Sequence, residues 1–104
     1  MQVNISDGTA TCVVPAELTV TYIQKMMEDV KKVLNEREDF NTVCVDLSKT
    51  ETIDSMGLTF LIGLYKTYSS QGKKIGLTGY NTALLEIFRI MRFDELFELS
   101  QQRE

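Results

Sequence analysis

The sequence predicts one α/β domain with a mixed, mostly parallel sheet of four to five strands packed by helices. Segments rich in β-branched residues alternate with segments of helical periodicity, which favours parallel strands joined by right-handed crossovers. The first two strand-like segments are instead joined by Asp7-Gly8, a pair typical of a tight hairpin, so one edge should be antiparallel. A length of 104 residues is enough for one domain with its own core.

The opening residues predict a hairpin. Val3 and Ile5 alternate with polar residues in 1–6, which is typical of a half-buried strand. Residues 9–14 form the second strand, which Pro15 ends because proline has no N–H to donate.

Residues 18–38 predict the first helix. Thr19 is a suitable N-cap because its hydroxyl can accept a free backbone N–H bond. Apolar residues recur with helical spacing and should form one buried stripe: Ile23, Met27, Val30 and Leu34.

Residues 42–47 are a β-branched run that predicts a covered strand, followed by a loop over 48–54. The second helix should begin near Ser55 and end before Gly72, a natural left-handed residue after a helix. Gly63 should let this helix approach the sheet closely. Its buried stripe is expected at Leu58, Leu61, Ile62, Tyr65 and Tyr68.

Residues 73–79 predict the next strand, and Asn81 should cap a third helix. The buried stripe of that helix is expected at Leu84, Phe88 and Met91, with Ile87 beside it. Residues 94–99 should close the domain as a short strand or a helical turn. The polar end of the domain, 99–104, should be a frayed tail because it has little to bury.

Composition excludes several classes of function. Fifteen acidic and eleven basic residues give a net charge of −4, and the basic residues are scattered, so nucleic-acid binding is not expected. The longest nearly apolar run, 56–65, is far shorter than the about 20 residues that span a bilayer. No basic-then-apolar pattern opens the chain, so we expect neither membrane insertion nor a signal peptide.

Side chains for catalysis or metal binding are scarce. The chain contains no histidine, which removes the commonest general base and metal ligand. Cys12 and Cys44 are isolated among β-branched residues and should be buried free thiols, which fits a cytoplasmic location. Asp46 and Asp54 could form a catalytic carboxylate pair, but acids at strand ends also cap helices and fix loops. We therefore predict neither an enzyme nor a bound cofactor or metal.

The topology itself predicts where a site should lie. In parallel sheets, ligands and partners gather at the carboxyl ends of the strands, where the loops 14–19, 48–57 and 78–83 should meet. Asp54 and Ser55 stand at the start of the second helix, whose unpaired N–H groups and partial positive charge would also stabilise a phosphate. The alternative is that either residue only caps the helix.

Residues 43–79, VCVDLSKTETIDSMGLTFLIGLYKTYSSQGKKIGLTG, resemble the STAS domain of bacterial anti-sigma factor antagonists. The diagnostic part is a strand ending in Asp-Leu-Ser, a loop, and an Asp-Ser-x-Gly-Leu start to a long helix. The opening hairpin and the closing FDELFEL extend the resemblance over almost the whole chain. It implies a small cytoplasmic module of a partner-switching pathway that binds an anti-sigma factor, usually a serine kinase. It also implies control by phosphorylation of the second hydroxyl residue of Asp-Ser-Ser/Thr-Gly.

This chain departs from the family pattern at the phosphoacceptor. Asp54, Ser55 and Gly57 match the motif, but the acceptor position is Met56, which cannot be phosphorylated. A second departure is Thr19, where members often have an aspartate. Control by phosphate at position 56 should therefore be absent, although Ser55 or Thr59 could be a substitute acceptor.

The resemblance and the topology predict a partner-binding surface at the amino end of the second helix and its flanking loops: Asp54, Ser55, Met56, Gly57, Thr59 and Thr19. Met56 should point outward because Leu58 and Leu61 already define the buried stripe; the alternative is that it turns inward and fills a gap.

The partner is expected to be an anti-sigma factor or kinase-type regulatory protein. A competing hypothesis is a STAS subunit or scaffold of a lipid-transport or signalling assembly outside sigma control. The oligomeric state stays open.

Overall fold

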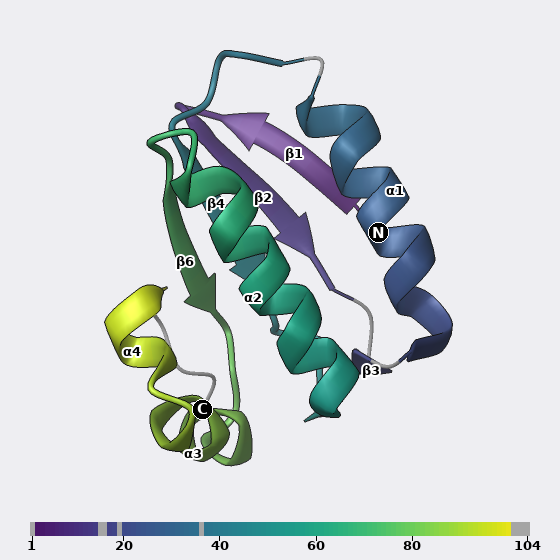
Figure 1. Cartoon of the computed structure of the whole chain (residues 1–104), viewed down its shortest axis with the longest axis vertical. Helices are drawn as coiled ribbons and strands as arrows, with labels where there is room; N and C mark the ends of the chain where they lie inside the picture. The colour runs from purple at the N-terminus through teal and green to yellow at the C-terminus, as the bar shows by residue number, and fades with distance from the viewer. Residues whose placement is uncertain (1, 15–16, 19, 36, 101–104) are drawn as a thin grey trace.

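A computed structural model describes residues 2–14, 17–18, 20–35 and 37–100. It contains a five-stranded sheet with the strand order β1-β2-β4-β6-β7 (Figure 1). These strands are β1 (Gln2–Ser6), β2 (Thr9–Val13), β4 (Thr42–Asp46), β6 (Lys74–Thr78) and β7 (Glu98–Leu99). Only the β1–β2 pairing is antiparallel; the other three pairings are parallel. The predicted mixed, mostly parallel sheet is therefore confirmed, with five strands.

The opening hairpin has the predicted turn. Asp7 and Gly8 both have positive φ, 52° and 80°, as the two central residues of a type I′ turn require. Pairing then runs without interruption from Ser6 opposite Thr9 to Gln2 opposite Val13. The turn therefore fixes the register of the antiparallel edge.

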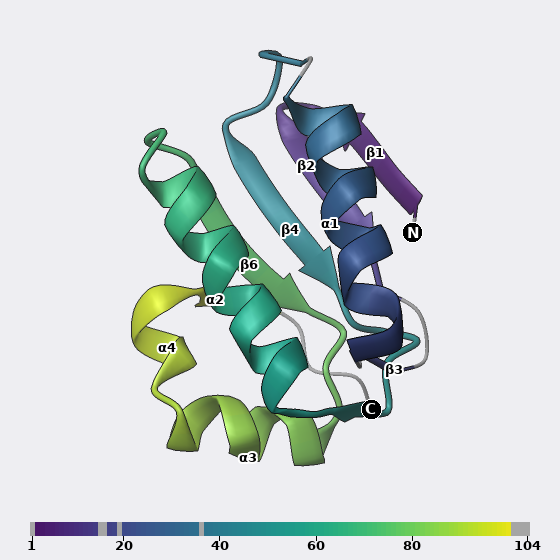
Figure 2. The ribbon, with the colours of Figure 1, turned by 45° about the vertical axis from the view of Figure 1, so that its right-hand side comes forward.

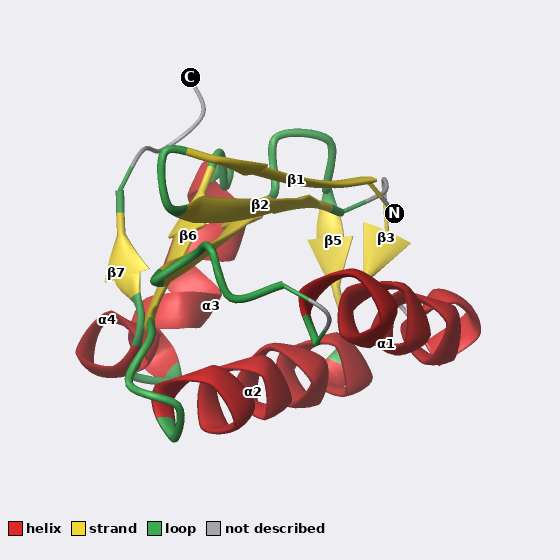
Figure 3. Cartoon of the chain, turned by 90° about the horizontal axis from the view of Figure 1, so that it is seen from above, coloured by secondary structure: helices red, strands yellow, loops and turns green. Residues whose placement is uncertain are grey.

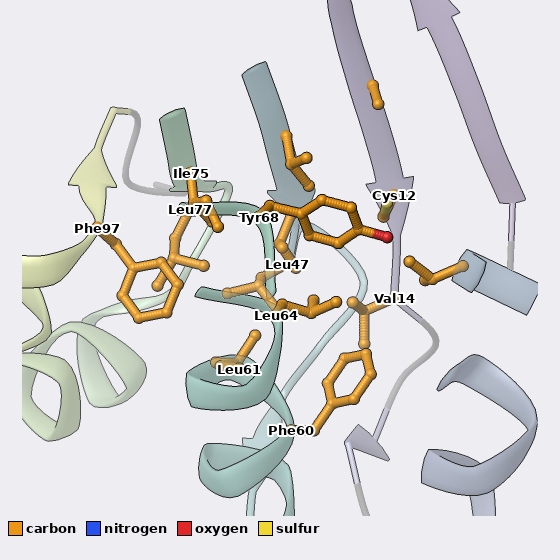
Figure 4. Packing of buried hydrophobic residues seen from close by; sticks show 14 of the residues in the cluster. Cys12, Val14, Leu47, Phe60, Leu61, Leu64, Tyr68, Ile75, Leu77 and Phe97 are labelled. Atoms are coloured by element: carbon orange, nitrogen blue, oxygen red, sulfur yellow. The ribbon is translucent and has the colours of Figure 1, made fainter. Parts of the chain in front are cut away.

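The helices are α1 (Val20–Leu34), α2 (Ser55–Ser69), α3 (Thr82–Ile90) and α4 (Phe93–Leu96). Figure 3 shows α1 and α2 together on one side of β1 and β2. Along β2 and β4 buried side chains alternate with half-buried ones, so one face of the sheet packs on the helices. Figure 4 shows this core, in which Phe60, Leu64 and Tyr68 of α2 pack towards the sheet.

The predicted stripes of the first two helices were partly wrong. In α1, Met26 is buried with Val30 and Leu34, whereas Met27 is only half-buried. In α2 the buried side chains are Phe60, Leu61, Leu64 and Tyr68, and the predicted Leu58, Ile62 and Tyr65 lie on its flank. Both helices have apolar residues in adjacent rows, so periodicity alone does not decide which row faces the sheet.

The predicted end of α3 was also wrong at one position. Leu84 and Phe88 are buried, but Met91 is 45% exposed because the helix ends at Ile90 and Met91 is its C-cap. Asn81 is the N-cap as predicted: its Oδ1 accepts a hydrogen bond from the N–H of Leu84 at 2.8 Å.

The closing segment forms both of the predicted alternatives, helix α4 and then strand β7. Three phenylalanines anchor it, with ring centroids 5.7 Å apart for Phe88 and Phe93 and 5.1 Å for Phe93 and Phe97. Leu99 of β7 pairs with Leu77 of β6. The strand therefore includes the first residue of the predicted tail; residues 101–104 lie outside the described part.

The two cysteines differ in burial. Cys12 is buried, and burial raises the pKa of its thiol to about 12. Cys44 is only half-buried, contrary to the prediction, because Val45 rather than Cys44 lies opposite Cys12 and neighbouring residues of a strand point to opposite faces. Burial also raises the pKa of the Cys44 thiol. Both thiols stay protonated at neutral pH, so neither is a reactive nucleophile.

Gly63 has no role in close packing, which overturns that expectation. A Cβ atom added there would meet nothing within 4 Å. Because alanine is the better helix former, Gly63→Ala should raise the free energy of unfolding by about 0.5–1 kcal/mol, measured by urea denaturation. Gly76→Ala is the control: its Cβ would lie 3.0 Å from the Glu98 carbonyl oxygen, so it should destabilise the protein. A loss of stability in Gly63→Ala would contradict the prediction.

Candidate functional site

Two loops at the carboxyl ends of the strands are joined by a second, two-stranded sheet. β3 (Glu17–Leu18) pairs in parallel with β5 (Thr52–Ile53), Glu17 opposite Thr52 and Leu18 opposite Ile53. This pairing was not predicted. It ties the segment before α1 to the segment before α2, so both helices start at the same end of the molecule (Figure 2).

The third loop joins the same end. The side-chain amide of Asn81 donates to the carbonyl oxygen of Glu51 at 3.3 Å, and the N–H of Leu47 donates to the carbonyl oxygen of Thr78 at 2.8 Å. The described parts of the three loops therefore meet as predicted from the topology.

Asp54 and Asp46, the two acidic residues considered for catalysis, each accept a hydrogen bond from a backbone N–H group nearby in sequence. Asp54 is the N-cap of α2: its backbone is extended (φ −95°, ψ −178°) and its Oδ1 accepts from the N–H of Gly57 at 2.8 Å. Asp46 Oδ1 accepts from the N–H of Ser48 at 2.9 Å. These contacts favour the capping interpretation. Within the described ranges, no three histidine, cysteine or acidic side chains are grouped to hold a metal ion.

The start of α2 presents four exposed residues, Asp54, Ser55, Met56 and Thr59, which we call the α2 N-terminal surface. The Met56 side chain is 46% exposed, so it points outward as predicted, although Leu58 is only half-buried. The Thr59 hydroxyl donates to the carbonyl oxygen of Ser55 at 2.9 Å, one turn back along the helix. The surface therefore has an apolar centre with a hydroxyl and a carboxylate beside it.

Of the remaining predicted site residues, one is buried and the other has no described position. Gly57 is buried beneath the surface, so its role is in the cap, where its N–H meets Asp54. Thr19 lies outside the described residues. Tyr22 was not among the predicted site residues; it is 47% exposed on the first turns of α1, at the same end as Met56 (Figure 2).

The cap makes a measurable contribution. Asp54→Ala should lower the free energy of unfolding by about 1 kcal/mol, because the Gly57 N–H loses its acceptor. Asp54→Ser should restore most of that stability, since serine is an equally good N-cap. Denaturant unfolding of the three proteins provides the test. Equal stability of the wild type and Asp54→Ala would contradict the cap assignment.

No helix in the described ranges combines the length and the apolar composition needed to cross a membrane.

Comparisons with known proteins agree with this geometry. Residues 1–99 match a family model described as Mlab, STAS domain. A comparison with curated protein sequences finds no match.

Several solved structures share the fold. One, from Thermotoga maritima and described as an anti-sigma factor antagonist, has a TM-score of 0.83 and 19% identity, covering 99% of this chain and 86% of the other. An anti-sigma factor antagonist from Mycobacterium paratuberculosis has a TM-score of 0.80 and 20% identity, covering 94% and 81%. The antagonist SpoIIAA, in its unphosphorylated form, has a TM-score of 0.73 and 11% identity, covering 95% and 86%.

At these identities the solved structures establish the fold, and the family model covers nearly the whole chain. The chain therefore belongs to the STAS domain family, with the fold of the anti-sigma factor antagonists.

Proposed function

We propose that this protein is a cytoplasmic binding module that docks an anti-sigma factor or kinase-type regulatory protein through its α2 N-terminal surface. We further propose that phosphate at position 56 does not control the docking. The observation that carries both statements is Met56, an exposed thioether at the position where the family resemblance places the phosphoacceptor.

The exposed thioether favours binding over switching. A flexible, polarisable side chain packs well against an adaptable partner surface. Burying a whole methionine side chain contributes about 1.5–3 kcal/mol, and nearly half of this one remains to be covered. A phosphoserine would instead place a charge of about −2 in the contact. A chain with methionine here would bind continuously, under control of its amount or of its partner.

Charge around the surface indicates the character of the partner. Glu51 and Asp54, which precede Met56 closely in sequence, are exposed, and the whole chain has a net charge of −4. Complementary charge speeds association and selects among partners. The docking surface of the partner should therefore have an apolar pocket rimmed by basic side chains.

Capture from the native cell, followed by a phosphorylation assay, tests the proposal. The wild-type chain should retain an anti-sigma factor or a kinase-type protein. After incubation with that partner and ATP, intact-mass measurement should show an unmodified chain that still binds. Stoichiometric phosphate on Ser55 or Thr59, with release of the partner, would overturn the locked-on model and identify a substitute acceptor.

A second candidate is a STAS subunit of a lipid-transport or signalling assembly outside sigma control. Met56 favours it as well, because a permanent subunit needs no phosphoacceptor. The same capture distinguishes the two functions. A permanent subunit would be recovered in fixed stoichiometry with the other components of its assembly and without any sigma-control protein.

A further inference from the structure

Strand β1 is an unprotected sheet edge. It is the last strand on its side of the sheet, so alternate residues direct their N–H and C=O groups away from β2. Natural edges are usually blunted by charged residues, proline, bulges or short length. Residues 2–6, QVNIS, contain no charge and no proline, and their pairing with β2 is regular over five residues. The opposite edge, β7, is only two residues long and includes Glu98.

The side chains of β1 are incompletely covered on the face that meets the helices. Val3 and Ile5 lie opposite Cys12 and Ala10, which are fully buried, and pack against the same core. Both nevertheless remain half-buried, because no strand in the described residues lies beyond β1. A further strand would cover these two apolar side chains and pair the free backbone groups together.

The strand is also complementary to itself. In an antiparallel pair with a two-fold axis at Asn4, Val3 lies opposite Ile5 of a second copy on the helix-covered face. Gln2 lies opposite Ser6 of that copy on the other face. This register pairs all five residues, apolar with apolar and polar with polar. A shift by one residue would place Val3 and Ile5 opposite polar side chains.

We propose that β1 pairs with β1 of a second copy of this chain, which joins the two sheets into one continuous sheet across a two-fold axis. The absence of charge on the strand favours a second copy over a partner attracted by charge. An isologous contact of this kind closes on itself and does not grow into a fibre. β1 contributes no residue to the α2 N-terminal surface, so the pairing is independent of the proposed function and leaves both copies of that surface available.

Sedimentation equilibrium over a wide concentration range tests the pairing. The wild type should show a reversible monomer–dimer equilibrium, and Asn4→Lys should raise the dimer dissociation constant at least about tenfold, because two lysines would meet at the axis, their Cβ atoms about 5 Å apart. Thr11→Lys is the matched control. Thr11 pairs with Asn4 but lies on β2, so its lysine would be one strand away from the contact between the two copies of β1. It should dimerise like the wild type. A wild type that stays monomeric, or a dimer that Asn4→Lys leaves intact, would overturn the proposal.

Cross-linking tests the register. In a Cys44→Ser background, Asn4→Cys should form an intermolecular disulfide under mild oxidation, because residue 4 faces its own copy. Gln2→Cys should not, because four residues along the strands separate the two copies of position 2, about 13 Å. Cross-linking of Gln2→Cys in place of Asn4→Cys would reject this arrangement.

Discussion

Replacing Gly79 with alanine is expected to lower the free energy of unfolding by about 2–4 kcal/mol. Gly79 has φ +74°, a left-handed conformation that an L side chain rarely adopts. A Cβ atom there would also lie 2.8 Å from the Ser48 backbone nitrogen and 3.0 Å from its Cα and Cβ atoms. Two of these three are backbone atoms, which cannot rotate aside, so the two loops would have to separate.

Gly72→Ala separates the cost of the left-handed conformation from the cost of the steric contact with Ser48. Gly72 has nearly the same conformation, φ +78°, but a Cβ atom there would meet nothing within 4 Å. This variant should lose only the conformational part, about 1–2 kcal/mol. Urea denaturation of both variants gives the comparison. Equal losses would show that the approach of Gly79 to Ser48 contributes nothing measurable.

The contact at Gly79 also bears on the binding surface. Ser48 opens the loop that leads to Asp54, and Asn81, two residues after Gly79, donates to Glu51 in that loop. Separation of these loops should therefore shift the backbone amide resonances of residues 48–57 in Gly79→Ala, and leave them in place in Gly72→Ala.

Much of the fold follows from local patterns. The Asp7-Gly8 turn and the alternation along β1 and β2 specify a hairpin within 12 residues, from Gln2 to Val13. Asp54 and Asn81 are good N-cap residues, so each indicates the start of a helix. These features depend on neighbours in sequence, which is why sequence analysis could predict them.

Contacts between distant segments explain what was missed. β3 and β5 have two residues each, too few for any periodic pattern, and their pairing depends on two loops being brought together. The choice of Met26 over Met27 depends on how α1 sits against the sheet. The topology predicted where the loops of the candidate site meet, but the exposure of Tyr22 was not predicted, because one aromatic residue on a helix has no pattern that shows which way it faces.

The largest effect on function is expected at Met56. In binding measurements with the partner recovered by capture, Met56→Glu and Met56→Lys should each weaken affinity by about 30-fold or more, about 2 kcal/mol. Either charge would have to leave water for the apolar floor of the partner's pocket, which is unfavourable whatever its sign. Met56→Leu should bind within a few-fold of the wild type, because it conserves volume and hydrophobicity.

The opposite charges also separate binding from folding. Position 56 is the second residue of α2, where the helix dipole favours a negative charge and disfavours a positive one by about 0.3–1 kcal/mol. The glutamate variant should therefore be slightly more stable than the lysine variant, while both lose binding, the lysine variant more because the rim of the partner's pocket is basic. If only one charge weakens binding, the contact at Met56 is electrostatic and the apolar pocket proposed for the partner is wrong. If neither charge weakens binding, the partner binds at another surface. The side chain at position 56 is 46% exposed on the first turn of α2, so a partner that covered it would bury the introduced charge, and at least one of the two variants would bind more weakly.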